Sequence, residues 1–156
     1  MKTPYVAVDQ GHLIVAREGS TGTEVAAYRR DDEGTWTADG ALPRPSGAGE
    51  WLGIGLSVSG DFALVGDAPP RTARPGAAYL YSRAAGIWTI VQSLEPVEPD
   101  ETGGFGLAVA LGGRSAVVGA PGGAQNPASL TGRVSAHRLL EPRAYLPVLP
   151  TIRRRF

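Results

Sequence analysis

The pattern of hydrophobic and polar positions predicts short β-strands along the whole chain. Apolar runs of about four to eight residues recur, and Gly or Pro interrupts nearly every window long enough for a helix. Turn signals separate the runs, and two of them, Ser59-Gly60-Asp61 and Ala85-Gly86, suit tight β-hairpins. The sequence therefore predicts an all-β fold in which hairpins join consecutive strands.

The same block of sequence recurs three times. Residues 52–69 align with residues 105–121, with a single extra residue near Asp67, and residues 6–16 align with residues 56–66. Aromatic and glycine positions extend the match, at Tyr28/Tyr81, Trp36/Trp88, Gly53/Gly106, Gly60/Gly113 and Gly66/Gly119. Such agreement indicates a tandem array of three units.

Each unit is expected to contain four strands, named A to D in chain order. Strand A is expected at 6–8, 54–59 and 107–111, strand B at 12–16, 62–66 and 115–119, strand C at 24–30, 76–83 and 132–139, and strand D at 35–38 and 87–93. A repeated four-stranded meander of about 50 residues is typical of a β-propeller blade.

The blades are expected at about 5–50, 51–103 and 104–142, within a repeat array that covers residues 1–142. The tail at 143–156 breaks the repeat, and either follows the folded part or adds an outer strand to the third unit. Three blades do not close a ring, because known propellers use at least four. The chain is therefore expected to form a partial propeller. Either it is a fragment of a longer secreted protein, or a second copy of the chain completes the ring. We favour the fragment.

Charge and composition exclude several classes of partner. Fifteen basic and fifteen acidic residues cancel, so no global field attracts nucleic acid or an anionic membrane. No stretch approaches the roughly 20 apolar residues of a membrane-spanning helix, and the N-terminus lacks the apolar run of a signal peptide. The absence of cysteine excludes disulfides and thiolate metal sites.

The second and third units resemble the bacterial FG-GAP repeat, which is related to the propeller of integrin α-subunits. Phe105-Gly106 matches the FG element and Gly119-Ala120-Pro121 the GAP element, while the second unit has Leu52-Gly53 and Gly66-Asp67-Ala68-Pro69. The first unit lacks FG and has Val15-Ala16-Arg17 in place of GAP. The resemblance implies a secreted or cell-surface bacterial protein in which a propeller serves adhesion or protein contact, and it implies no catalysis.

Integrin-like repeats also bind calcium through an Asp-rich loop, but this property is not expected here. The corresponding A–B turns are Asp9-Gln10-Gly11, Ser59-Gly60-Asp61 and Gly112-Gly113-Arg114. Each turn is short and has at most one carboxylate, whereas Ca²⁺ needs six to eight oxygen ligands. No metal ion or other cofactor is therefore expected.

The leading hypothesis for function is a non-catalytic binding or scaffolding module. The B–C connections at 67–75 and 120–131 vary in length and composition while the strands keep their register, so these loops are expected to contact a partner. The candidate contact residues are Trp51, Asp67, Arg71, Arg74, Gln125 and Asn126. The alternative is a carbohydrate-binding, lectin-like propeller in which Trp51 and exposed tyrosines stack on sugars.

Catalysis is not expected. The only histidines are His12 and His137, and the sequence pairs neither with a nucleophile and an orienting carboxylate. The acidic triplet Asp31-Asp32-Glu33 is expected to be an exposed turn. The glycine-rich stretches lack the Lys-Ser/Thr and the helix of a phosphate-binding loop, so repeat geometry explains them better.

Overall fold

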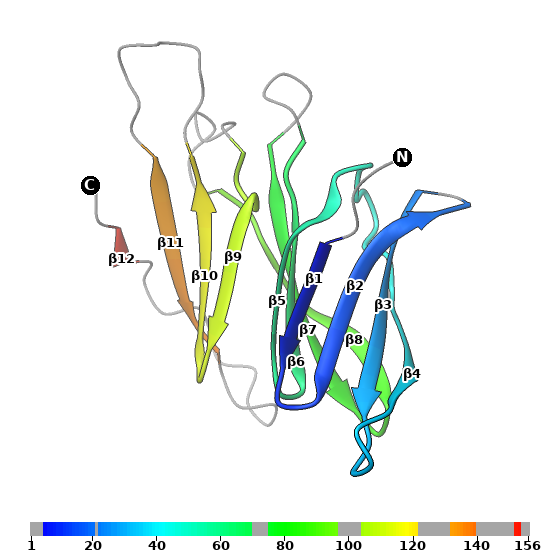
Figure 1. Ribbon diagram of the computed structural model, residues 1–156. Helices are drawn as coiled ribbons and strands as arrows, with labels where there is room; N and C mark the ends of the chain where they lie inside the picture. Colours follow the sequence, from blue (N-terminus) through cyan, green and yellow to red (C-terminus); the bar gives the residue numbers. More distant parts are fainter. Residues whose placement is uncertain are drawn as a thin grey trace.

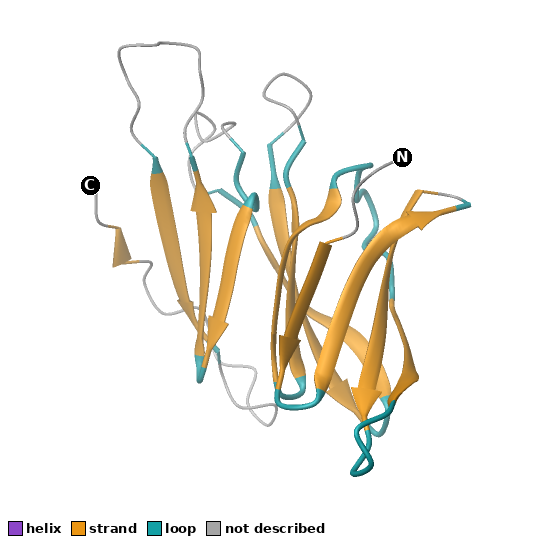
Figure 2. Cartoon of the chain, in the orientation of Figure 1, coloured by secondary structure: helices purple, strands orange, loops and turns teal. Residues whose placement is uncertain are grey.

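The protein is all-β in the computed structural model, which describes residues 5–20, 22–69, 75–96, 104–121, 132–139 and the backbone of 152–153. These residues contain twelve strands in three four-stranded antiparallel sheets (Figure 2). Within each sheet the strands lie side by side in chain order. The prediction of an all-β fold of consecutive meanders is confirmed.

The three sheets follow one another along the chain. Sheet I contains β1 (Tyr5–Asp9), β2 (His12–Gly19), β3 (Gly22–Arg30) and β4 (Trp36–Leu42). Sheet II contains β5 (Leu52–Ser59), β6 (Phe62–Asp67), β7 (Ala77–Ala84) and β8 (Ile87–Leu94). Sheet III contains β9 (Ala108–Gly112), β10 (Ser115–Ala120), β11 (Arg133–Arg138) and β12 (Ile152–Arg153).

The outer strand of sheet III comes from the tail. β12 is only two residues long and pairs with β11 through Ser135↔Arg153 and Ala136↔Ile152. Of the two expectations for the tail, an added outer strand is therefore the one observed. The strand lies after the proline-containing segment that breaks the repeat.

Two-residue turns join the first two strands of each sheet, as the sequence predicts. Gln10 and Gly11 both have positive φ, 43° and 81°, as a type I′ turn requires. In sheets II and III the first turn residue, Gly60 or Gly113, has a positive φ of 54° or 55°, which suits a type II′ turn. Both turn types match the right-handed twist of the strands they join.

One backbone hydrogen bond recurs in all three sheets and shows that their geometry is repeated. The carbonyl oxygen of the second turn residue accepts a hydrogen bond from an N–H at the end of the third strand or just after it. The three bonds are Arg30 N to Gly11 O at 2.8 Å, Arg83 N to Asp61 O at 2.8 Å, and Leu139 N to Arg114 O at 2.6 Å.

Strands β6 and β7 of sheet II are buried on both faces, and sheet II lies between the other two sheets (Figure 1). Alternating side chains of β6 and β7 enter two separate cores, because successive residues of a strand point to opposite faces. Val65 and Tyr81 pack with residues of sheet I, whereas Leu64 and Leu80 pack with residues of sheet III. The first strand of each sheet packs on the first two strands of the preceding one, β5 on β1 and β2, and β9 on β5 and β6.

The FG element of the third unit packs directly on the GAP element of the second. Phe105 is buried, and the backbone of Phe105-Gly106 lies against sheet II. A Cβ atom on Gly66 would overlap the carbonyl oxygen of Gly106, and one on Gly76 would overlap that of Phe105. Close approach of two backbones therefore explains why glycine stands at these positions.

Candidate functional site

The meanders give the molecule two distinct ends (Figure 1). The hairpin end carries the turns at 10–11, 60–61 and 113–114, together with the turns that lead into β4 and β8. The loop end is where β6 and β10 end and where β5, β7 and β11 begin. Both B–C connections leave the sheets at the loop end, so this end is the candidate contact surface.

Trp51 lies at the loop end, immediately before β5, and 37% of its surface is exposed. It belongs to the segment 43–51 that connects sheet I to sheet II, which we call the linker loop. An indole at a protein surface offers a large apolar area with few rotatable bonds, a common feature of binding anchors. Trp51 as a contact residue stays a prediction.

The linker loop is held in place by side chains from inside and outside it. The Arg44 guanidinium donates hydrogen bonds to the carbonyl oxygens of Thr23 at 2.8 Å, Ala48 at 3.0 Å and Gly49 at 2.9 Å. The Thr23 hydroxyl donates to the Glu50 carbonyl at 3.1 Å. These bonds connect the loop to the start of β3 and restrict its backbone.

Tyr81 adds a buried tether to the same loop. Its hydroxyl donates a hydrogen bond to the Pro43 carbonyl at 2.9 Å. Burial raises the pKa of Tyr81 well above its ordinary value, and the neighbouring Tyr79 raises it further, against a lowering effect of Arg44. The phenol therefore stays protonated and remains a hydrogen-bond donor.

Asp67 is completely buried at the end of β6. One carboxylate oxygen accepts a hydrogen bond from the Gly49 N–H at 2.8 Å, so the side chain ties the GAP element of sheet II to the linker loop. We expected Asp67 among the partner contacts, but its full burial assigns it to supporting the loop that carries Trp51. The remaining candidates, Arg71, Arg74, Gln125 and Asn126, lie outside the described residues.

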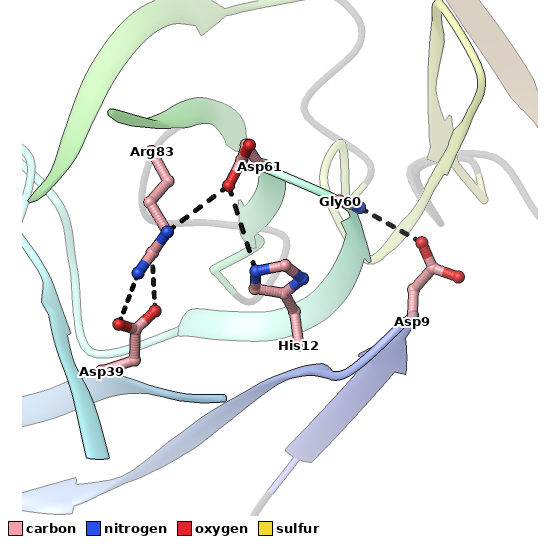
Figure 3. A network of polar contacts seen from close by, with 6 residues as sticks. All are labelled: Asp9, His12, Asp39, Gly60, Asp61 and Arg83. Atoms are coloured by element: carbon pink, nitrogen blue, oxygen red, sulfur yellow. Dashed lines mark hydrogen bonds and ion pairs between the residues drawn. The ribbon is translucent and has the colours of Figure 1, made fainter. Parts of the chain in front are cut away.

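A second polar group, at the hairpin end, was not predicted from the sequence (Figure 3). Arg83 Nη2 donates a hydrogen bond to Asp39 Oδ1 at 2.6 Å. Its Nε lies 2.6 Å from Asp39 Oδ2, an ion pair that lacks hydrogen-bond alignment. The bond to Asp39 raises the pKa of Arg83 against the opposing effect of burial, so the guanidinium is permanently charged. The pair connects β4 of sheet I to β7 of sheet II.

Asp61 and His12 extend this group. Asp61 Oδ1 lies 3.6 Å from Arg83 Nη1 and 4.0 Å from His12 Nε2, and Asp9 accepts a hydrogen bond from the Gly60 N–H at 3.2 Å. The sequence pattern of a single repeat unit does not indicate these contacts, because they join residues of sheets I and II. The same position of the repeat is Arg30 in the first unit and Leu139 in the third. A charged residue is therefore not required there, and the repeat position of Arg83 does not predict an ion pair.

The A–B turns do not fit a calcium ion. The Asp61 carboxylate lies 3.6 Å from the positively charged guanidinium of Arg83, which repels a cation. Asp9 already accepts a backbone N–H, and Ca²⁺ requires six to eight oxygens. In the parts of the chain that the structure describes, no three His, Asp or Glu side chains gather in an arrangement suited to a metal.

No family model and no curated protein matches this sequence. The resemblance to FG-GAP repeats therefore rests on the motifs quoted above. Within the described ranges, no helix is long and apolar enough to cross a membrane.

Proposed function

We propose that this chain is a set of β-propeller blades that binds a protein partner, without catalysis, through its loop end. The observation that carries the proposal is the placement of Trp51, partly exposed on a loop held by Arg44 and Asp67. The strands that both variable B–C connections join also end or begin at the loop end. A secreted or cell-surface setting is proposed on the FG-GAP resemblance alone.

The blade assignment is supported by how the sheets pack. Each sheet is a four-stranded meander, and in sheets II and III the first strand lies on the first two strands of the sheet before it. The turn hydrogen bonds recur in all three sheets, and the backbone of Phe105-Gly106 packs on Gly66 of the sheet before it. Face-to-face repetition of such meanders around an axis is the architecture of a propeller.

A rigid tryptophan suits recognition because binding then costs little conformational entropy. Ordering a mobile side chain or loop reduces affinity, and a preorganised surface avoids most of that cost. Tryptophan is also among the residues that most often contribute strongly to protein interfaces. The bonds from Arg44 and Asp67 keep the linker loop ordered before any partner arrives.

The first test is Trp51→Ala in the intact chain, with a partner identified by pull-down and then purified. We expect affinity to fall by about 30-fold or more, as for an anchor that contributes about 2 kcal/mol. Ile87→Ala is the matched control, because Ile87 is 65% exposed but lies at the hairpin end. Equal affinities for wild type and Trp51→Ala would contradict the proposal.

The second test replaces the two variable loops. Residues 70–74 and 122–131 are exchanged for short Gly-Ser turns, while Asp67 is kept because it holds the linker loop. Loss of partner binding with an unchanged thermal unfolding temperature is expected. Retained binding in this variant would exclude the B–C loops as the contact surface.

The alternative is a carbohydrate-binding propeller, which the exposure of Trp51 also supports because an indole face stacks on sugar rings. A glycan array distinguishes the two proposals. A lectin would give a sugar signal that Trp51→Ala abolishes, whereas a protein-binding module would give none.

A further inference from the structure

Sheets I and III each turn one face away from sheet II, and both of these faces are apolar. On sheet I the outer face, which we call the head face, carries Val6, Val8, Val15, Tyr28 and Trp36. Val6 and Val8 are each 64% exposed. An exposed apolar surface of this kind marks an interaction site on a soluble protein.

The head face carries the repeat counterparts of the residues by which sheet II packs on sheet I. Tyr81 and Trp88 of sheet II are buried in the core between sheets I and II, Trp88 with 4% exposure. Their repeat counterparts on sheet I are Tyr28 and Trp36, and Trp36 is 39% exposed. The head face thus presents the side chains that a blade uses to cover the blade before it.

The outer face of sheet III is the complementary surface, which we call the tail face. It carries Ala110, Val117, Val134 and Ala136 on β9, β10 and β11. Val117 lies opposite Ala110 and Ala136, and Val134 lies opposite Gly119. Their counterparts in sheet II are Ser57, Leu64, Ala78 and Leu80, which lie on the face of sheet II that packs on sheet III.

The tail face also keeps the glycines that make room for an incoming backbone. Gly119 and Gly132 are the counterparts of Gly66 and Gly76. Among the described residues, the atoms nearest to a Cβ on Gly119 or Gly132 belong to sheet III or its own loop, at 3.3 Å or more. In sheet II the same positions meet the backbone of the next sheet.

We propose that the tail face of one copy of this chain binds the head face of a second copy, repeating the packing of sheet II on sheet I. The chain itself supplies both halves of that interface, each made of repeat counterparts of residues that are already packed inside it. The net charge is zero, so no overall repulsion opposes the contact between copies. The docking does not depend on the proposed function.

Such a contact joins different surfaces, so two copies can form it twice and close on each other. Three sheets from each copy then make a ring of six, within the four to eight blades of known propellers. This count rests on the proposed blade assignment. The internal contacts predict which residues meet. Inside the chain the Leu111 N–H donates to Ser57 Oγ at 2.9 Å, and the residues at the corresponding positions of the two copies are Val8 and Ala110.

The first experiment measures the mass of the protein by light scattering over a range of concentrations. We expect twice the 16.2 kDa chain mass for the wild type, monomers for Trp36→Arg and for Val134→Arg, and a dimer when these two variants are mixed. The mixture restores one intact head–tail pair. Ile87→Arg is the control and should match the wild type, and circular dichroism checks that each variant is folded.

A wild type that stays monomeric at every concentration would overturn the proposal. This holds also if a different protein binds the head and tail faces. A Val134→Arg variant that still dimerises would also overturn it, because the head face would then bind another head face. Either result leaves the loop-end proposal standing, since that proposal concerns Trp51 and is read from partner affinity.

A second experiment does not depend on the arginine variants folding. The chain has no cysteine, so Val8→Cys in one copy and Ala110→Cys in another introduce a single thiol each. We expect mild oxidation of the mixture to give mainly the mixed disulfide dimer. A yield no greater than that of Val8→Cys mixed with Ile87→Cys would contradict the predicted contact.

Discussion

The carbonyl oxygen of Gly106 occupies the space that a Cβ atom on Gly66 would need. The two residues belong to different repeat units, and they bring the backbone of the third unit into direct contact with a strand of the second. Gly66 has an ordinary strand conformation, since its φ is not positive. The requirement for glycine at this position is therefore steric and comes from the neighbouring sheet.

Gly66→Ala should lower the free energy of unfolding by about 1–3 kcal/mol, as expected for a group forced into a filled space. Gly112→Ala is the matched control, because Gly112 also lies in a strand without positive φ and has no atom within 4 Å of the added Cβ. Urea unfolding of both variants provides the comparison. Equal stability of the two variants would show that the sheets do not approach each other as closely as described.

The turn between β7 and β8 offers a stabilising substitution. Ala85 has a φ of 50°, a left-handed conformation that disfavours alanine and that asparagine tolerates. Ala85→Asn should raise the free energy of unfolding by about 0.5–1 kcal/mol. Gly86→Ala should lower it by about 1–2 kcal/mol, because Gly86 has a φ of 79° and open space around it, so only backbone strain changes. Opposite signs in thermal unfolding are the expected result.

The ion pair at the hairpin end should contribute through Asp39 and hardly through Asp61. Asp39→Asn should cost about 1.5–3 kcal/mol, the range for a hydrogen bond to a charged group, because both side chains of the Arg83–Asp39 pair are largely buried. Asp61→Asn should cost less than about 1 kcal/mol, since its side chain is 60% exposed and lies 3.6 Å away.

A double-mutant cycle with Arg83→Met and Asp39→Asn measures the coupling directly. We expect a coupling energy of about 0.5–3 kcal/mol for the pair in contact, and a smaller one for the same cycle with Asp61→Asn. The reverse order would mean that the contacts in Figure 3 do not describe the pairing in solution.

His137 should make stability depend on pH in the acid range. Burial lowers the pKa of His137 in the folded protein, so below the ordinary histidine pKa of about 6.5 the unfolded chain binds more protons. Stability should be fully present above about pH 6.5 and should decrease as the pH falls toward the folded-state pKa, with a slope of at most about 1.4 kcal/mol per pH unit from this residue. Denaturant midpoints between pH 5 and 8 measure the effect.

His137→Gln is the companion variant for this prediction. It removes the titrating group, so the difference in pH dependence between wild type and variant isolates the contribution of His137. His12 remains in both proteins and cancels from the comparison. An identical slope in the two proteins would contradict the assignment of the pH dependence to His137.

The candidate site was only partly predictable from the sequence. Trp51 was chosen because it precedes an FG-like pair, and the structure places it on the surface of the linker loop. Asp67 was chosen as an inserted carboxylate, but its burial and its bond to Gly49 follow from how the linker loop folds over sheet II. The sequence of one repeat unit does not predict which residues of another unit will contact it.

The sequence alone determined the strands and hairpins of the repeat, because alternation of apolar residues and the requirements of two-residue turns are local. It left open the outer strand of sheet III, which the tail supplies. Positions such as Gly60 and the Ala85-Gly86 pair specify hairpins wherever the chain places them. Only the tertiary structure decided which polar groups meet. Arg83 and Asp39 lie 44 residues apart in different sheets, and their contact depends on the packing of sheet II beside sheet I, where β8 lies against β4. It also decided that Trp88 is buried while Trp36 is exposed, because a sheet covers one and not the other.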